Sequence, residues 1–287
     1  MKVWIDGEFF DKADARISVF DHGLLYGDGV FEGIRVYGGK AFMLTDHIDR
    51  LFKSAEAIAL AIPTGREEME EAVRTTIGVN EKTDGYIRLL VTRGVGDLGV
   101  DPAKCPRASV IIIVADITLY PAEYYEKGIK LVTASVRRIP PDCLDPRIKS
   151  LNYLNNILAK LEAGRAGCQE AVMLSQKGFV TECTGDNIFI VRDSRILTPP
   201  SWCGALDGIT RKVVARLATT LSIPCQETML AQYDLYTADE CFLTGTGAEV
   251  VPVVEIDGRK TGDGKPGKVT RRLVNAFSEY VRETGSR

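Results

Sequence analysis

Apolar side chains recur at two different periods along the chain, and each period predicts one kind of secondary structure. Over residues 46–61 the apolar positions fall three or four apart on one stripe, which predicts an amphipathic helix. Further helices are predicted over 66–79 and 269–282, and others begin near Leu151 and Ile209. Short runs rich in β-branched and aromatic residues, bounded by turn residues, predict strands. These cover residues 2–5, 16–18, 30–37, 41–44, 86–92 and 109–117, and later 130–135, 171–175, 179–182, 188–191 and 240–244.

Strands and helices alternate, so the predicted class is α/β with some α+β character. The 287 residues are enough for two modest domains, each with its own core. A stretch with Pro121 and little apolar periodicity is typical of a linker. We therefore expect a small domain over 1–118, a linker over 119–127 and a larger domain over 128–287.

Composition excludes several classes of protein. The net charge of −3 gives no basic excess for nucleic acid, and no apolar run is long enough to cross a bilayer. The seven cysteines are scattered without a C-x-x-C motif, which favours reduced thiols over a zinc site. With only His22 and His47, a multi-histidine metal centre is excluded. We expect a soluble, cytoplasmic protein without metal, nucleic-acid partner or membrane partner.

One lysine lies where a helix would alter its chemistry. Lys149 follows a proline-marked loop and comes just before the helix that carries Leu154, Leu158 and Leu161 on one side. The positive end of the helix dipole disfavours a cation there, and this lowers the pKa of the lysine. A lysine nucleophile needs such a lowered pKa, although a solvated lysine near a helix start has the same sequence pattern.

Three later segments combine small residues with polar groups. Glu182 ends a strand at a turn of small residues. Gly208-Ile209-Thr210 enters a helix, where unpaired backbone N–H groups form a phosphate site. Gly245-Thr246-Gly247 allows close approach of a ligand, but it lacks the third glycine of a dinucleotide-binding loop. Taken singly, each segment also fits a surface turn or a helix cap.

In this order and spacing, the four segments resemble the fold type IV enzymes that use pyridoxal 5'-phosphate, a class-IV aminotransferase family. Among them the chain is most similar to the branched-chain amino-acid aminotransferases. The match runs from residues 20–27 to residues 269–272. The resemblance implies a two-domain architecture with the active site between the domains, and a homodimer or a higher homo-oligomer.

The resemblance also implies a role for each matched residue. Lys149 carries the cofactor covalently and moves the substrate proton, and Glu182 pairs with the pyridine nitrogen. Tyr153 bonds the phenolic oxygen of the cofactor, and Leu206 packs on its ring. The phosphate is bound by Arg50, Ile209, Thr210 and Thr246. The substrate pocket is lined by Tyr26, Phe31, Tyr86, Arg88, Gly247 and Ala248.

The implied reaction transfers the amino group of leucine, isoleucine or valine to 2-oxoglutarate, giving the 2-oxo acid and L-glutamate. Gly27-Asp28-Gly29 departs from the branched-chain pattern and is seen in D-amino-acid aminotransferases and aminodeoxychorismate lyases, which stay as alternatives. The D-specific enzymes carry an Arg-x-His pair in the loop after the strand predicted over 86–92, whereas the loop over 93–104 has no histidine here. The lyase usually has threonine at the position of Gly33. A non-catalytic binding protein is disfavoured because Lys149 and Glu182 are both present.

Overall fold

A computed structural model describes residues 1–117 and 120–286. Contacts divide the chain into two compact units. The first contains residues 1–117, 148–152 and 281–286, and the second contains residues 120–147 and 153–280. The boundary that we predicted between residues 118 and 119 lies outside the described residues.

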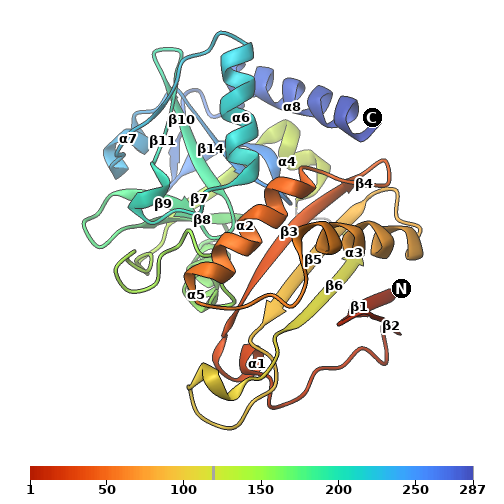
Figure 1. Cartoon of the computed structure of the whole chain (residues 1–287). Coiled ribbons are helices and arrows are strands. Elements are labelled where there is room, and N and C mark those ends of the chain that lie inside the picture. The colour runs from red at the N-terminus through yellow and green to blue at the C-terminus, as the bar shows by residue number, and fades with distance from the viewer. Residues whose placement is uncertain (118–119, 287) are drawn as a thin grey trace. The chain divides into compact units, whose positions relative to one another are not determined.

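The described part of the first unit forms a six-stranded antiparallel sheet in the order β2-β1-β6-β5-β3-β4 (Figure 1). Helices α2 and α3 cover one face, while α1 precedes β3. The elements are β1 (Lys2–Ile5), β2 (Glu8–Asp11), α1 (His22–Tyr26), β3 (Gly29–Tyr37), β4 (Lys40–Ala41), α2 (Leu44–Ala57), α3 (Arg66–Val79), β5 (Gly85–Thr92), the 3₁₀ turn η1 (Pro102–Lys104) and β6 (Ser109–Ala115).

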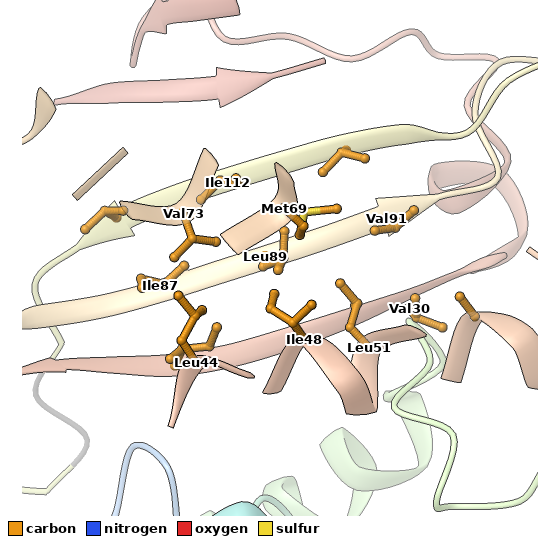
Figure 2. Packing of buried hydrophobic residues seen from close by; sticks show 14 of the residues in the cluster. Val30, Leu44, Ile48, Leu51, Met69, Val73, Ile87, Leu89, Val91 and Ile112 are labelled. Carbon is orange, nitrogen blue, oxygen red and sulfur yellow. The ribbon is translucent and has the colours of Figure 1, made fainter. Parts of the chain in front are cut away.

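The core of this unit lies between the sheet and the two helices. Figure 2 shows Ile48 and Leu51 of α2 and Met69 of α3 pointing at the sheet residues Ile87 and Leu89. All five are almost fully excluded from solvent. The apolar stripe that predicted α2 therefore faces the sheet.

The ends of α2 and the strands around it differ from the prediction. The helix ends earlier because Ala59 has a left-handed backbone conformation (φ 49°), and the Leu60 N–H then donates to the Ala55 carbonyl at 2.9 Å. Only two of the residues after the Gly38-Gly39 turn form β4, since the helix already begins at Leu44. In the described structure, residues 16–18 belong to no strand.

The described part of the second unit contains a nine-stranded mixed sheet in the order β12-β11-β10-β13-β14-β7-β8-β9, with β15 also paired to β14. Three neighbouring pairs are parallel, namely β11/β12, β14/β7 and β7/β8. The strands are β7 (Ile129–Thr133), β8 (Glu170–Leu174), β9 (Val180–Cys183), β10 (Asn187–Arg192), β11 (Arg195–Thr198), β12 (Cys225–Glu227), β13 (Glu240–Gly245), β14 (Glu249–Ile256) and β15 (Arg259–Lys260). The helices are α4 (Ala122–Lys127), α5 (Leu154–Arg165), the 3₁₀ turn η2 (Ser201–Cys203), α6 (Ile209–Thr220), α7 (Gln232–Tyr236) and α8 (Lys268–Ser286).

Two helices of this unit add to what the sequence indicated. Residues 122–127, inside the predicted linker, form α4, and Tyr124 packs against the core of the second unit. The leucines of α5 do share one side, but that side is exposed, with Leu154 67% accessible. The buried side carries Ala159 and Ala163, because small side chains let the helix lie close to β8. No helix in the described residues is both long and apolar enough to cross a membrane.

Candidate active site

The segment that carries Lys149 lies along the first half of β3, within the first unit. The Phe31 N–H donates to the Lys149 carbonyl and the Leu151 N–H donates to the Gly29 carbonyl, both at 2.9 Å. The Lys149 N–H donates to the Ser54 hydroxyl of α2 at 3.2 Å. These bonds tie the lysine to β3 and α2 from a position more than ninety residues further along the chain.

Two cations and two aromatic rings gather on the face of β3 opposite the core. The Lys149 Nζ lies 4.4 Å from the ring centroid of Phe31. The Arg88 guanidinium lies 4.6 Å from the same centroid and 5.5 Å from that of Tyr86. Both cations face ring π-clouds, which attract positive charge. The structure thus brings together three of the predicted substrate residues with the predicted catalytic lysine.

Gly33 determines where the Tyr86 hydroxyl can lie. Gly33 is paired with Arg88 in the β3/β5 register, and a Cβ atom added to it would be 1.7 Å from the Tyr86 hydroxyl oxygen. The hydroxyl therefore occupies the space that any side chain at position 33 would fill. At the level of sequence, Gly33 served only to distinguish families, and its packing role was missed.

The fourth predicted substrate residue, Tyr26, ends α1. Its hydroxyl accepts a hydrogen bond from the Gly99 N–H at 2.8 Å. Its ring meets His22 edge-on with centroids 5.0 Å apart. His22 is buried, and its Nε2 lies 2.9 Å from the Asp97 carbonyl oxygen. His22 therefore has a structural role in joining α1 to the loop after β5.

The Gly27-Asp28-Gly29 departure also has a structural explanation. The Asp28 carboxylate accepts from Arg93 Nε at 2.9 Å and Nη2 at 3.0 Å. Arg93 donates in turn to the carbonyls of Ile58 and Ala59 at the end of α2. Asp28 is thus part of an ion pair that joins three segments of the first unit.

Arg50, the predicted phosphate ligand, extends from α2 toward β3. It donates from Nε and Nη2 to the two carboxylate oxygens of Glu32, at 2.7 and 2.8 Å. His47 Nδ1 lies 2.7 Å from Glu32 Oε2. Glu32 was not identified from the sequence, because a single glutamate on an apolar strand gives no sign of its partners.

In the second unit, Glu182 is a buried carboxylate with both oxygens engaged. Oε1 accepts from Arg138 Nε at 2.9 Å and Oε2 accepts from the Leu206 N–H at 2.8 Å. Arg138 is itself buried and donates to Asn155 Oδ1 at 3.1 Å. Both oxygens of the buried Glu182 carboxylate are therefore hydrogen-bonded. Arg138 is a second residue that sequence reasoning did not identify.

The other predicted cofactor residues of this unit lie at the ends of several elements. Asn187 donates to the Leu206 carbonyl at 2.9 Å and pairs with Thr244 on β13, two residues before Thr246. Ile209 and Thr210 are buried at the start of α6, and Thr246, Gly247 and Ala248 form the turn after β13. Tyr153 directly precedes α5 and is half-buried. The structure thus joins Glu182 directly to Leu206 and connects Leu206, through Asn187, to the strand before Thr246.

Comparisons with known proteins agree with this arrangement. The model of the family described as amino-transferase class IV matches residues 29–256. A Methanocaldococcus jannaschii protein, provisionally described as a branched-chain-amino-acid aminotransferase, is 53% identical over 285 residues, which is 99% of this chain and 98% of that protein. The chain belongs to the class IV aminotransferase family.

Solved structures extend the likeness to the whole fold. The crystal structure of the Escherichia coli branched-chain amino acid aminotransferase superposes with a TM-score of 0.94 at 37% identity, covering 97% of this chain and 93% of that one. The branched-chain amino acid aminotransferase from Thermobaculum terrenum, in its PLP-bound holo-form, superposes with a TM-score of 0.88 at 30% identity, covering 98% and 93%. The predicted mixed α/β, fold type IV class and the resemblance to branched-chain aminotransferases are confirmed.

Proposed function

We propose that the protein transfers the amino group of a branched-chain L-amino acid to 2-oxoglutarate, with pyridoxal 5'-phosphate as its cofactor. The observation that carries the proposal is the group on β3, where the Lys149 amine lies beside the aromatic ring of Phe31 and the same ring faces Arg88. An amine, apolar walls and a fixed cation suit an amino acid with an apolar side chain. The names of the similar enzymes support the same reaction.

The second unit offers groups that fit this cofactor. Helix α6 has no side-chain cap at Gly208, so the first N–H groups, near the buried Ile209 and Thr210, suit a phosphate. Glu182 is a buried anion, which suits a protonated pyridine nitrogen. We assign Tyr153 to the phenolic oxygen of the cofactor, Leu206 to its ring, and Thr246 with Arg50 to its phosphate.

Each residue then has a defined task in the reaction. When bound, the cofactor supplies an electron sink for the negative charge that forms at the substrate Cα. Lys149 in its neutral form removes the Cα proton and holds it until it is returned. Glu182, which is paired with Arg138, would hold a proton on the pyridine nitrogen. Phe31 and Tyr86 exclude water from the side chain of the substrate.

The substrate residues explain how one pocket accepts two kinds of acid. Aromatic walls discriminate weakly between apolar side chains, since each methylene in such a pocket is worth about 1–3 kcal/mol. We therefore propose broad use of leucine, isoleucine and valine. For glutamate and 2-oxoglutarate, Arg88 binds the distal carboxylate by a charge-assisted hydrogen bond. We also assign the backbone N–H groups of Gly247 and Ala248, and the side chain of Tyr26, to substrate binding.

Reduction of the holoenzyme with borohydride followed by peptide mapping tests the cofactor assignment. The label is expected on Lys149, and a label on Lys160 or Lys177 would show the assignment to be wrong. Specificity constants for L-leucine, L-alanine, D-alanine and D-glutamate with a common acceptor test the substrate. Preference for either D-amino acid would favour the D-amino-acid alternative and leave the cofactor assignment intact.

We further propose that the protein is a homodimer or a higher homo-oligomer. Residues 19–25 and 95–100 are neighbouring segments, joined by a hydrogen bond from the Gly96 N–H to the Phe20 carbonyl at 3.2 Å. These segments carry exposed apolar residues, namely Val19, Phe20, Leu24, Leu25, Val95, Leu98 and Val100. Large exposed apolar patches mark association sites. Leu98→Asp should shift sedimentation toward the monomer, whereas Val79→Asp, at a single exposed apolar residue at the end of α3, should not.

Two organisational proposals remain. The free thiols of all seven cysteines support a cytoplasmic location, because reduced cysteines persist there. A fluorescent fusion imaged in cells tests it, and export would contradict it. We also propose that the chain divides into domains 1–118 and 128–287 joined by residues 119–127, with residues 148–152 and 281–286 contributing to the first compact unit. Limited proteolysis should cut first between them, and first cleavage inside either domain would argue against that division.

A further inference from the structure

A buried ion-pair cluster lies between β3 and α2 in the first unit. The Glu32 cluster consists of Glu32, His47 and Arg50. The side chains of Glu32 and His47 are fully buried and that of Arg50 is 10% exposed. Neighbouring positions on the same face of β3 are Val30 and Ile34 in the apolar core. A carboxylate in such a layer is costly unless it is fully paired.

The protonation states of the cluster follow from its contacts. Burial opposes ionisation of Glu32, but Arg50 and then His47 outweigh it and hold the pKa of Glu32 well below its ordinary range. Burial lowers the pKa of His47 in spite of the Glu32 carboxylate. His47 is therefore neutral near pH 7, and its Nδ1–H donates to Glu32. Its Nε2 has no hydrogen-bond partner among the described residues.

The Glu32 cluster as a whole carries no net charge. Its contribution to phosphate binding is therefore the orientation of the Arg50 guanidinium and not a net electrostatic attraction. Arg50 donates from Nε and Nη2 in parallel to the two oxygens of Glu32, and such a fork fixes both the plane and the direction of a guanidinium. His47 holds the carboxylate from a second side. Without Glu32, the long arginine side chain would adopt several rotamers.

We propose that Glu32 is a positioning residue for the cofactor phosphate, acting through Arg50, with His47 holding the carboxylate in place. The inference rests on the proposed function, in which Arg50 binds that phosphate. Ser54, one turn after Arg50 on α2, accepts the backbone N–H of Lys149. Helix α2 thus contains Arg50, which is proposed to bind the phosphate, and Ser54, which forms a hydrogen bond to the segment of Lys149.

Titration of the apoprotein with pyridoxal 5'-phosphate and, separately, with pyridoxal tests the proposal. Glu32→Gln keeps the shape and removes the charge. The affinity for the phosphorylated compound should fall about tenfold, the effect of one misplaced charge-assisted hydrogen bond, while that for pyridoxal stays unchanged. Asp49, also on α2, forms an exposed ion pair with Arg66 of α3, and Asp49→Asn, which removes an equal charge, should change neither affinity. An unchanged or higher affinity of Glu32→Gln for pyridoxal 5'-phosphate would overturn the proposal, because a pure charge effect strengthens phosphate binding.

Two further variants separate the possible failures. If Arg50→Ala binds both compounds like the parent, the phosphate assignment in the proposed function is wrong. If Arg50→Ala weakens only the phosphorylated compound and Glu32→Gln does not, the inference alone fails. Should circular dichroism show Glu32→Gln unfolded, His47→Leu keeps the Glu32–Arg50 pair and removes one bond to the carboxylate. The affinity of His47→Leu for pyridoxal 5'-phosphate is then expected to be about threefold lower than that of the parent, with no change for pyridoxal. An affinity for pyridoxal 5'-phosphate equal to that of the parent would overturn the inference.

Discussion

Replacing Gly33 by alanine tests whether the position of Tyr86 determines catalysis. The backbone at position 33 does not need glycine, since its φ is not in the left-handed region. The new Cβ would lie 1.7 Å from the Tyr86 hydroxyl oxygen and 2.6 Å from its Cζ. In folded proteins a Cβ atom essentially never lies closer than 3.0 Å to such an atom. The end of the tyrosine must therefore move by more than an ångström.

The size of the effect follows from that displacement. A misplacement of about 1 Å in a positioning group costs about a hundredfold in rate, which corresponds to about 2.7 kcal/mol. We expect kcat/KM for L-leucine to fall by that factor in Gly33→Ala. The free energy of unfolding should change little, because the atom that must move is the far end of a half-buried side chain.

Steady-state kinetics with L-leucine and 2-oxoglutarate measure the effect, and thermal unfolding monitors the fold. Gly78→Ala in α3 is the matched control, because an added Cβ there meets nothing within 4 Å. A second test is Tyr86→Phe in the Gly33→Ala background, which removes the nearest clashing atom and should restore part of the rate. If Gly33→Ala kept the parent kcat/KM, the reasoning that ties Tyr86 to the substrate would be refuted.

Three other predictions follow from single groups. Glu182→Gln should retain the cofactor while turnover slows by orders of magnitude, and near-normal kcat would contradict the role of its charge. Arg88→Ala should raise KM for 2-oxoglutarate more than KM for leucine, and equal changes would exclude Arg88 from binding the distal carboxylate. Burial, and then the nearby Glu170, raises the pKa of Asp186 from 3.8 to about 7, so its contribution to stability is present below pH 3.8 and lost as the pH rises through about 7. Between pH 5 and pH 8 the melting temperature of Asp186→Asn should therefore decrease less than that of the parent protein. An identical decrease in both proteins would argue against a raised pKa of Asp186.

The local sequence was sufficient to predict most of the helices and strands. Helix α3 has the predicted bounds, and its start is stabilised locally, since the Gly65 N–H donates to the Glu68 side chain at 3.1 Å. Lys149 and Glu182 were assigned through the family resemblance of their segments, and their place at junctions of elements only added support, so their roles stay predictions. Element ends were less accurate. The end of α2 depends on the left-handed conformation of Ala59, which cannot be predicted from an alanine in the sequence.

The tertiary structure decided which side chains meet. Glu32 and Arg50 are 18 residues apart and Arg138 and Glu182 are 44 apart, so no local pattern relates them. Tyr86 lies over Gly33 only because β3 and β5 pair in one register, and a shift of one residue would turn Tyr86 to the core. The leucines of α5 show the same limit, since helical spacing put them on one side and only packing against β8 determined that this side faces outward. Sequence periodicity specifies which residues share a face, whereas contacts between distant segments depend on how the elements pack in three dimensions.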